Sequence, residues 1–525
     1  MMRFFIAVSL LALASCSSDS PKSCTTSEDC GPAAVCEQKA CAALPQGECR
    51  LPSVCTAPSN ATATCSDTHL CGFNCNQGFV DCSGECVQES PDACGPACTK
   101  CTAPQNGYAT CTVGVCGSAC YSTAPDLCPD QGSGLACLNQ SPCPISCTAD
   151  QTLCAAGCCS TPTAVSAGGD FTCILTKAKQ VQCFGDNAYG KLGNNSVKQS
   201  LIGVDVLSSP GSVLNGITSI SAGGSFACAV TGSSGGVKCW GQNDLGQLGN
   251  NTETPSSVAV DVLDASLQQL TGSVLVSSGT NSACELGASG GVSCWGSNAN
   301  GELGIATTQG SPVALAVTLA SASAISVASH HACAALKSGS ASCWGLNTNS
   351  SLGLGDSTVV EATTPTPVVN LSTVQTISAS TDNTCALTTG GGVYCWGFGS
   401  AGQLGNGSTS FQSSVPVQVT NLSSGVIQVG AGYHFACALT AGGSVLCWGA
   451  NDAGQLGNGT TSNSSVPVQT TGLNSGVTSL SVGSRHACAL MNSGTVKCWG
   501  SNAFGNLGDG TTTSRTTPVA VLLDH

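Results

Sequence analysis

The sequence predicts an all-β protein, namely a seven-bladed β-propeller preceded by a disulfide-rich, irregular segment. Three observations support this prediction. A Cys-Trp-Gly tripeptide recurs six times in the later part of the 525-residue chain, at intervals of 49–55 residues. Cysteine is abundant, with 39 residues, and most of them lie at short, irregular spacings in the first part. Charged residues make up 8% of the chain and hydrophobic residues 41%, which argues against disorder of the whole chain.

Residues 1–15 have the pattern of a secretory signal peptide. Arg3 precedes an apolar run, 4–14, that is too short to span a hydrocarbon layer about 30 Å thick. The run ends in Leu-Ala-Ser-Cys16, which resembles the lipobox of bacterial lipoproteins, and the resemblance implies cleavage before Cys16 and its lipidation. The alternative is an ordinary signal peptide followed by a chance cysteine. With lipidation, we expect an anchored protein of the bacterial cell envelope, in the outer membrane or at the cell surface.

Residues 16–162 are predicted to form a Cys-rich stalk segment. After Cys16 it contains 24 cysteines, few strand-like runs and few large apolar residues, so covalent cross-links must replace a sizeable core. The motif Cys98-Thr-Lys-Cys101 leaves zinc ligation and redox chemistry open, but no second such pair lies at zinc-ribbon distance. Disulfides are the favoured reading, and their connectivity cannot be derived from spacing.

From residue 163 to 525 a unit of 49–56 residues repeats seven times. A representative copy has Phe-Ala-Cys437, then Val-Leu-Cys447-Trp-Gly, then Asn451-Asp-Ala-Gly-Gln-Leu-Gly, and a Pro-Val run follows. This pattern resembles the regulator-of-chromosome-condensation repeat family, whose units carry a Trp-Gly and then an Asn-x-x-Gly-Gln-Leu-Gly turn. The resemblance implies a propeller. Two copies depart from it, because Phe184 replaces the first Trp and Ser350 replaces the first Gly of the fourth turn.

Each unit offers four short strand-like runs, and seven such units predict a ring of seven four-stranded blades. We expect the Pro-Val run to be the first strand of each blade. The first unit begins near Ala164 without a Pro-Val run, whereas a lone Pro-Val run, 517–522, follows the last unit. The C-terminal strand is therefore expected to complete the first blade and close the ring.

In each unit two cysteines lie 10 or 11 residues apart on either side of a turn. This spacing allows them to face each other on antiparallel strands, with Cα atoms about 4.5 Å apart, which is within disulfide range. In an exported protein we expect seven disulfides, and reduced cysteines acting as small core residues are the alternative. The expected pairs are Cys173 with Cys183, Cys228 with Cys239, Cys284 with Cys294, Cys333 with Cys343, Cys385 with Cys395, Cys437 with Cys447, and Cys488 with Cys498.

All six tryptophans belong to the Cys-Trp-Gly motif, and we expect them to pack blade against blade rather than to stack on a ligand. They are Trp240, Trp295, Trp344, Trp396, Trp448 and Trp499. The histidines of the repeats, His330, His331, His434 and His486, are expected to be structural or to cap turns, and no metal site is predicted.

Composition and motifs limit the function. A net charge of −14 argues against a nucleic-acid partner, because phosphates attract cationic surfaces. The sequence shows no catalytic constellation, no phosphate-binding loop and no cofactor motif, so we expect a non-enzymatic protein. A rigid ring that presents variable loops suits binding. We therefore expect a monomeric, membrane-anchored scaffold that binds or adheres to a protein or glycan.

Three other functions stay open. One is that of a protein inhibitor, since a seven-bladed relative of this family inhibits β-lactamases. Another is guanine-nucleotide exchange, the activity from which the family takes its name. The last is a glycan-active enzyme whose carboxylates come from several blades.

Overall fold

The computed structural model describes residues 161–232 and 234–523 with their side chains, and twelve short strands between residues 34 and 160 by their backbone. The chain divides into two compact units, 1–146 and 147–525. Cys16, the lipobox and the Cys98/Cys101 motif lie outside the described residues.

The twelve strands of the Cys-rich segment pair into six separate two-stranded antiparallel hairpins, although the sequence suggested few strands there. Strands of four to six residues are too short to show a hydrophobic period. In several hairpins two cysteines are register partners, such as Cys36 with Cys41 and Cys65 with Cys71. The hairpins are β1 (Ala34–Glu37) with β2 (Ala40–Ala43), β3 (Ala61–Cys65) with β4 (Cys71–Cys75), β5 (Phe79–Cys82) with β6 (Glu85–Gln88), β7 (Gly107–Thr112) with β8 (Val115–Cys120), β9 (Asp126–Asp130) with β10 (Gly134–Leu138), and β11 (Gln151–Cys154) with β12 (Gly157–Ser160).

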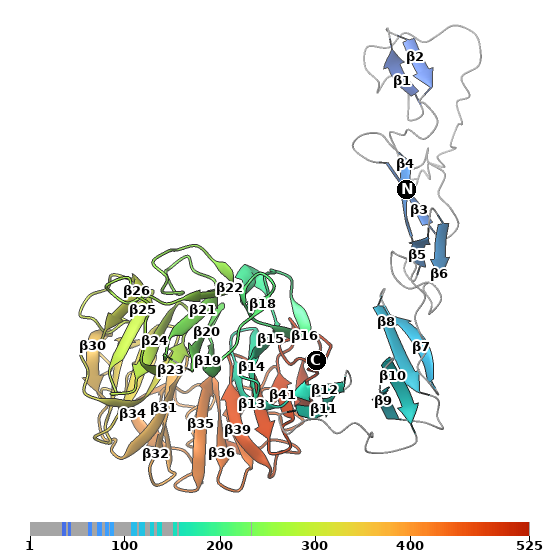
Figure 1. Cartoon of the computed structure of the whole chain (residues 1–525). Coiled ribbons are helices and arrows are strands. Elements are labelled where there is room, and N and C mark those ends of the chain that lie inside the picture. Colours follow the sequence, from blue (N-terminus) through green and yellow to red (C-terminus); the bar gives the residue numbers. More distant parts are fainter. Residues whose placement is uncertain are drawn as a thin grey trace, which may run out of the picture. The chain divides into compact units, whose positions relative to one another are not determined.

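The repeats form a seven-bladed β-propeller, which confirms the predicted fold class (Figure 1). Each blade is a four-stranded antiparallel meander whose first strand is innermost and whose fourth is outermost. The blades are β13 (Pro162–Ala167) to β16 (Ser200–Asp205), β19 (Ile217–Ala222) to β22 (Ser256–Asp261), β23 (Ser273–Ser278) to β26 (Ser311–Ala316), β27 (Ala322–Val327) to β30 (Glu361–Pro367), β31 (Val374–Ala379) to β34 (Gln412–Gln418), β35 (Val426–Gly432) to β38 (Ser464–Gln469), and β39 (Val477–Val482) to β42 (Arg515–Ala520).

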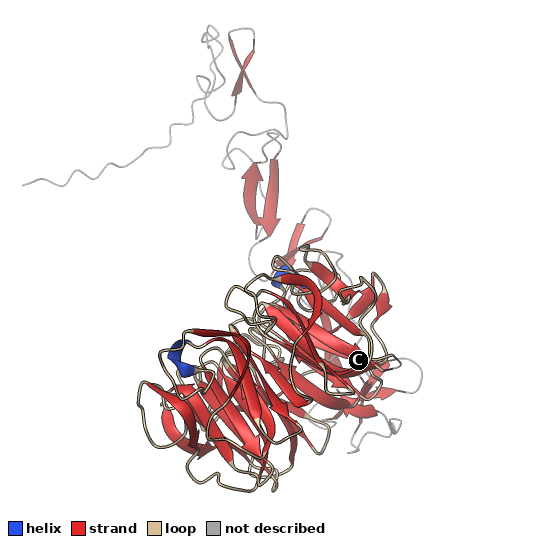
Figure 2. Cartoon of the chain, turned by 90° about the vertical axis from the view of Figure 1, so that its left-hand side faces the viewer, coloured by secondary structure: helices blue, strands red, loops and turns tan. Residues whose placement is uncertain are grey.

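The strands between these bounds carry the paired cysteines. The second strands are β14 (Phe171–Thr176), β20 (Phe226–Thr231), β24 (Ser282–Gly287), β28 (His331–Leu336), β32 (Asn383–Thr388), β36 (Phe435–Thr440) and β40 (His486–Met491). The third strands are β15 (Val181–Gly185), β21 (Val237–Gly241), β25 (Val292–Gly296), β29 (Ala341–Leu346), β33 (Val393–Phe398), β37 (Val445–Gly449) and β41 (Val496–Gly500). A small hairpin, β17 (Leu207–Ser209) with β18 (Ser212–Val213), follows the first blade. Apart from strands, Figure 2 shows short helical turns such as η3 (Ala188–Gly190) and η4 (Thr348–Ser350).

The expected closure by a C-terminal strand in the first blade is wrong. The C-terminal strand β42 pairs with β41 of its own blade, and the first blade builds its outer strand, β16, from residues that follow it in sequence. The Pro-Val run is thus the last strand of each blade, because the Gly-rich turn after Cys-Trp-Gly returns the chain antiparallel onto the strand it has just left. Proline is tolerated there since it lies on an edge strand.

The ring closes by packing between the first and the seventh blade. Strand β13 contacts both β39 and β40. A buried apolar cluster joins Ile174 and Phe184 of the first blade to Leu490 and Leu507 of the seventh, and Val519 of β42 packs against it. The C-terminal strand therefore supports closure by side-chain packing, without leaving its own blade.

Candidate functional site: the mouth face of the propeller

Every tryptophan lies at a junction between blades, fully buried. Its indole Nε1–H donates a 2.9 Å hydrogen bond to a backbone carbonyl in the long outer turn of the preceding blade. A buried indole N–H needs such an acceptor. The donor and acceptor pairs are Trp240 with Lys191, Trp295 with Gln247, Trp344 with Glu302, Trp396 with Ser351, Trp448 with Gln403, and Trp499 with Gln455.

The glycine that ends each outer turn lies against the tryptophan of the next blade. At Gly193, a Cβ atom would lie 2.9 Å from Cδ1 of Trp240, and the backbone φ angle is +69°. Both the space and the conformation therefore require glycine. The repeated Leu-Gly of the turn thus serves the contact between blades.

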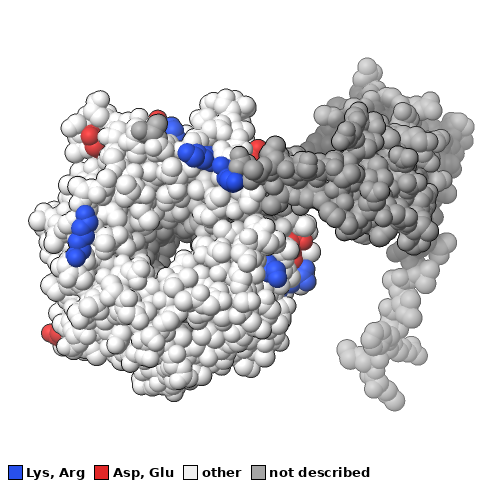
Figure 3. Space-filling view, turned by 60° about the horizontal axis from the view of Figure 1, so that its bottom comes forward, with Lys and Arg blue, Asp and Glu red and all other residues white. Residues whose placement is uncertain are grey.

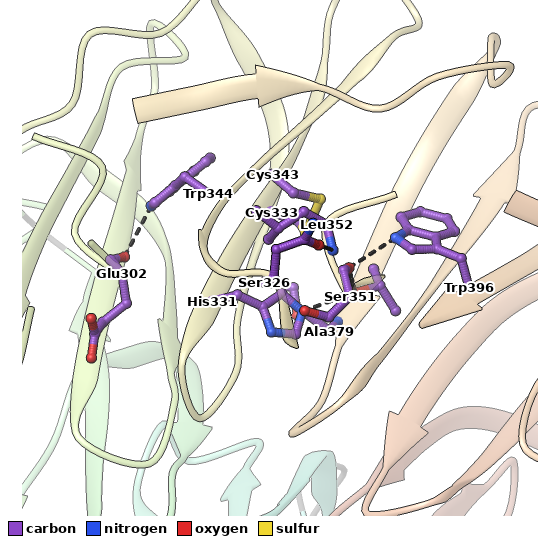
Figure 4. Close-up of a disulfide and its surroundings, with 12 residues drawn as sticks. Glu302, Ser326, His331, Cys333, Cys343, Trp344, Ser351, Leu352, Ala379 and Trp396 are labelled. Carbon is purple, nitrogen blue, oxygen red and sulfur yellow. Dashed lines mark hydrogen bonds between the residues drawn. A yellow bond between two sulfur atoms is a disulfide. The ribbon is translucent and has the colours of Figure 1, made fainter. Parts of the chain in front are cut away.

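Each of the seven cysteine pairs forms a disulfide between the second and third strands of a blade. The partners are directly opposite in register, with Cα atoms 4.0–4.1 Å apart. Figure 4 shows the bond between Cys333 and Cys343 beside the tryptophan contacts of its neighbourhood. These cysteines are buried and do not line the channel, so the disulfides brace each blade and take no part in a surface site.

The junction between the seventh and first blades has Phe184 where the others have tryptophan, so no indole can donate there. The equivalent carbonyl, that of Asn506, accepts instead from Thr172 Oγ1 at 2.8 Å. That hydroxyl also lies 2.8 Å from Nε2 of His486. Since the threonine proton goes to the carbonyl, His486 must donate through Nε2–H.

The junction between the fourth and fifth blades has a histidine and a threonine at the equivalent positions. His331 Nε2 lies 2.9 Å from Thr384 Oγ1, and this hydroxyl donates to the carbonyl of Ser351 at 3.0 Å. Figure 4 shows His331 and Ser351 close to Trp396, which donates to the same carbonyl. Burial lowers the pKa of His331 and of His486 to about 4, so both imidazoles are neutral at pH 7. These two histidines hold blades together, and no solvent or substrate reaches them.

A cavity of about 210 Å³ occupies the centre of the ring, lined by the innermost strands and the turns that follow them. Its lining is glycine, alanine, valine, serine and threonine with one tyrosine, and includes no charged residue. Figure 3 shows the opening at the centre of one face, surrounded by uncharged surface. Nothing in this lining offers a nucleophile with a base beside it.

Serine hydroxyls of the innermost strands link successive blades around this channel. Each accepts a hydrogen bond of 2.8–3.0 Å from a backbone N–H of the neighbouring blade. The sixth blade has Gly430 at this position, and there Gln428 replaces the missing contact, since its side-chain amide bonds both the N–H and the carbonyl of Leu480. The acceptors are Ser166, Ser221, Ser277, Ser326, Ser378 and Ser481.

We use the name mouth face for the side of the ring formed by the inner turns after the first strands and the long outer turns after the third strands. The inner turns are 168–170, 223–225, 279–281, 328–330, 380–382, 433–434 and 483–485. All four tyrosine and phenylalanine side chains that are exposed among the described residues lie on it, namely Tyr189, Phe411, Tyr433 and Phe504. The opposite side carries the tight hairpin turns and is called the hairpin face.

Four rings form a continuous aromatic strip on the mouth face, across the fifth and sixth blades. Phe411 packs edge-on against Phe398, with centroids 5.4 Å apart, and Phe398 lies 4.9 Å from the ring of His434. Tyr433 stacks on His434 at 3.9 Å. Phe411 is 62% exposed and Tyr433 40% exposed, so the strip offers ring surface to solvent.

The carboxylate of Asp382 adjoins this strip. It lies 3.5 Å from Nε2 of His434 and accepts from the side-chain amide of Asn349 at 3.4 Å. The hydrogen bond from His434 is the main cause that holds the pKa of Asp382 below its usual value, so the carboxyl is ionised at neutral pH. His434 has a φ angle of +62°, in the left-handed region that histidine adopts more readily than most residues.

Sequence reasoning placed His434 among the structural histidines and missed Asp382, Phe398, Phe411 and Tyr433. Phe398, Phe411 and Tyr433 each occur in one repeat, whereas Asp382 has an equivalent in Asp170 of the first blade. A usable signal was the departure of the fifth outer turn from the repeat, because Gly399 replaces the asparagine that holds most of these turns. In the turns that keep this asparagine, as at Asn243, its side chain accepts from the N–H of Leu248 and donates to loop carbonyls.

Within the described ranges no three His, Cys, Asp or Glu side chains are grouped to hold a metal ion. No helix of the described part is both long and apolar enough to cross a membrane. Chemically, the mouth face therefore offers aromatic surface, a carboxylate and loop polar groups.

The geometry defines a disulfide-bonded repeat propeller. Residues 215–525 match the family model of the RCC1-like domain, and residues 163–191 match that of the regulator of chromosome condensation (RCC1) repeat. The chain therefore belongs to the RCC1-like propeller family, which confirms the resemblance seen in the sequence.

Two curated proteins illustrate the similarity. The E3 ubiquitin-protein ligase HERC2 of Homo sapiens is 31% identical over 283 residues, which are 52% of this chain and 6% of that protein. The ultraviolet-B receptor UVR8 of Arabidopsis thaliana is 27% identical over 364 residues, 68% of this chain and 69% of the receptor. This chain thus matches only a small part of HERC2.

Solved structures share the fold at lower identity. Human WBSCR16 has a TM-score of 0.57 and 23% identity, covering 66% of this chain and 94% of that one. Prp20p of Saccharomyces cerevisiae, described as binding Gsp1p and histones, has a TM-score of 0.54 and 18% identity, covering 62% and 81%. These identities support the propeller fold and say nothing further about this chain.

Proposed function

We propose that this chain is a lipid-anchored protein of the bacterial cell envelope whose propeller binds a protein partner through its mouth face. The family is one of protein-interaction scaffolds, and the observation that carries the proposal is the location of all four exposed Tyr and Phe rings of the described part on that face. Aromatic side chains dominate the energetics of protein interfaces. Membrane anchoring rests on the lipobox, with Cys16 as the acceptor of the lipid.

Anchoring is tested with the full chain produced in a bacterial host that processes lipoproteins. We expect the protein to enter the detergent phase and to incorporate an alkyne-tagged fatty acid. Cys16→Ser should abolish both, whereas the matched variant Cys24→Ser should retain both. Fatty-acid labelling that survives Cys16→Ser would refute this assignment.

Partner binding is tested by crosslinking on intact cells, followed by mass spectrometry and by pull-down with the full chain. The mouth-face variant Tyr189→Ser/Phe504→Ser should lose the recovered protein. The hairpin-face variant Leu267→Ser/Ile427→Ser removes two similarly exposed apolar side chains and should retain it. Equal loss in both variants would contradict a mouth-face site, and recovery of a secreted hydrolase would favour the inhibitor function.

A further inference from the structure

The carboxylate of Asp382 has no Lys or Arg as its partner among the described residues, although other cations lie on the same face. Three of those cations are held by neighbouring carboxylates, in the pairs Lys191 with Asp186, Arg485 with Asp452, and Arg515 with Asp509. Its neighbours are instead the imidazole of His434 and the side-chain amide of Asn349. A half-buried negative charge is thus left beside the aromatic strip.

Carboxylates also outnumber Lys and Arg in the other turns of the mouth face, although Lys198 is an exposed cation in one of its outer turns. Asp244, Glu253 and Asp356 lie in its outer turns and make no ion pair within the described residues. The turns of the hairpin face, in contrast, carry lysines, such as Lys179 and Lys337. The charge of the ring is therefore polarised, and the potential of the mouth face favours a positively charged group.

An aromatic face beside a carboxylate is the chemical environment that proteins use to bind a guanidinium or ammonium group. Here the carboxylate of Asp382 is held by His434, and His434 is in turn stacked under Tyr433, so the anion and the ring surface are fixed relative to each other. Phe398, packed against His434, links this pair to the exposed ring of Phe411. The components of a cation site are thus held in place by contacts across two blades.

From this geometry we infer that the aromatic strip, together with the carboxylate of Asp382, binds an arginine or lysine side chain of the protein partner. The cation lies over an aromatic face and against the carboxylate, and the acidic outer turns attract neighbouring positive charges. This inference deepens the proposed function and depends on it.

The test uses the full chain and a hexa-arginine peptide, with a hexa-citrulline peptide as the uncharged analogue of equal shape. Binding is measured by calorimetry at several salt concentrations. We expect hexa-arginine to bind and hexa-citrulline to fail. Asp382→Asn and Tyr433→Ala should each weaken hexa-arginine binding about tenfold, as expected for a charge pair or a cation–π contact removed at a partly desolvated site.

The matched control is Asp244→Asn, which removes the same charge from an exposed outer turn of the same face and should change the affinity less than twofold. Equal weakening by Asp382→Asn and Asp244→Asn would overturn the site, because it would mean diffuse attraction only. Binding of hexa-citrulline with unchanged affinity would also overturn it. The glycan alternative is tested with chitotetraose as the probe. If chitotetraose binds the parent chain and Tyr433→Ala abolishes this binding, the strip is a glycan site and the cation site is wrong.

The same variants separate this inference from the proposed function. If the partner recovered from cells binds the parent chain but is unaffected by Asp382→Asn and Tyr433→Ala, the cation site is wrong and the binding function stands. If no protein partner is recovered while hexa-arginine binding shows the expected pattern, the protein-binding function fails although the cation site exists.

Discussion

Thr172 of the first blade and His486 of the seventh share a hydrogen bond of 2.8 Å, and the same hydroxyl donates to the carbonyl of Asn506. This threonine takes over the task that an indole N–H performs at the other junctions. The ring therefore closes on a buried polar contact, where Phe184 supplies only apolar surface.

We predict that Thr172→Val lowers the free energy of unfolding by about 1–3 kcal/mol, because it leaves the carbonyl of Asn506 buried and unpaired. Thr384→Val is the matched control, since Trp396 still donates to the carbonyl of Ser351 there. Denaturant unfolding should show a smaller loss for the control. Adding Phe184→Trp to Thr172→Val should restore part of the stability, and equal losses at both threonines would contradict this account of closure.

The two buried histidines predict a stability that falls in acid. In the folded ring their pKa is about 4, against 6.5 for an ordinary histidine, so the unfolded chain takes up protons first as the pH falls. The stability that follows from keeping each buried histidine neutral is fully present above pH 6.5 and is lost progressively as the pH falls to 4. It amounts to about 3 kcal/mol for each histidine.

The double variant His331→Phe/Thr384→Ala tests the pH effect at one junction. It installs the phenylalanine and alanine that stand at the corresponding positions of other blades, as in Phe226 and Ala283. The unfolding free energy of the parent chain should fall between pH 7.5 and pH 4.5 because both buried histidines resist protonation. The variant removes one of the two, so the part of this fall that the histidines cause should be about halved. An unchanged pH dependence would show that His331 is not the responsible group.

The seven blade disulfides predict no free thiol at the fourteen cysteines of the ring. Alkylation without reduction, followed by mass spectrometry, should label none of them. Cys333→Ser/Cys343→Ser should destabilise the ring by less than about 3 kcal/mol, because the closed loop is shorter than 15 residues. Labelling of these cysteines in the folded exported protein would favour the alternative of reduced core residues.

Gln428 should be essential to the junction between the sixth and seventh blades. Gln428→Ala removes both hydrogen bonds to Leu480, and we expect a loss of about 1–3 kcal/mol in denaturant unfolding. Gly430→Ser should not compensate, because its Cβ would lie 2.6 Å from a methyl carbon of Val482. A neutral effect of Gln428→Ala would mean that the serine-type contacts contribute little to ring stability.

Much of the fold could be predicted because every blade repeats it. The period of Cys-Trp-Gly determined the number of blades, the paired cysteines determined which strands are neighbours, and the tryptophans were correctly assigned to the blade junctions. The Pro-Val strand was assigned to the start of the following blade instead of the end of its own. The repeat period is the same whether a blade begins or ends with that strand, so the period cannot distinguish the two assignments. Strand β42 pairs with β41 because the turn at Gly505–Gly508 folds the chain back onto its own blade, and the repeat period does not report which way that turn leads.

The candidate site could not be predicted in the same way, since Phe411 and Tyr433 each occur in one repeat and Asp382 lies up to 51 residues from them in sequence. A repeat pattern reports what all blades share, namely the packing between them. Function depends on what single blades add to one face, and only the curvature of the ring brings those additions together. Repetition along the chain therefore predicts the architecture, whereas the closure of the ring and the meeting of its aromatic rings with the carboxylate of Asp382 depend on how single residues are brought together by folding.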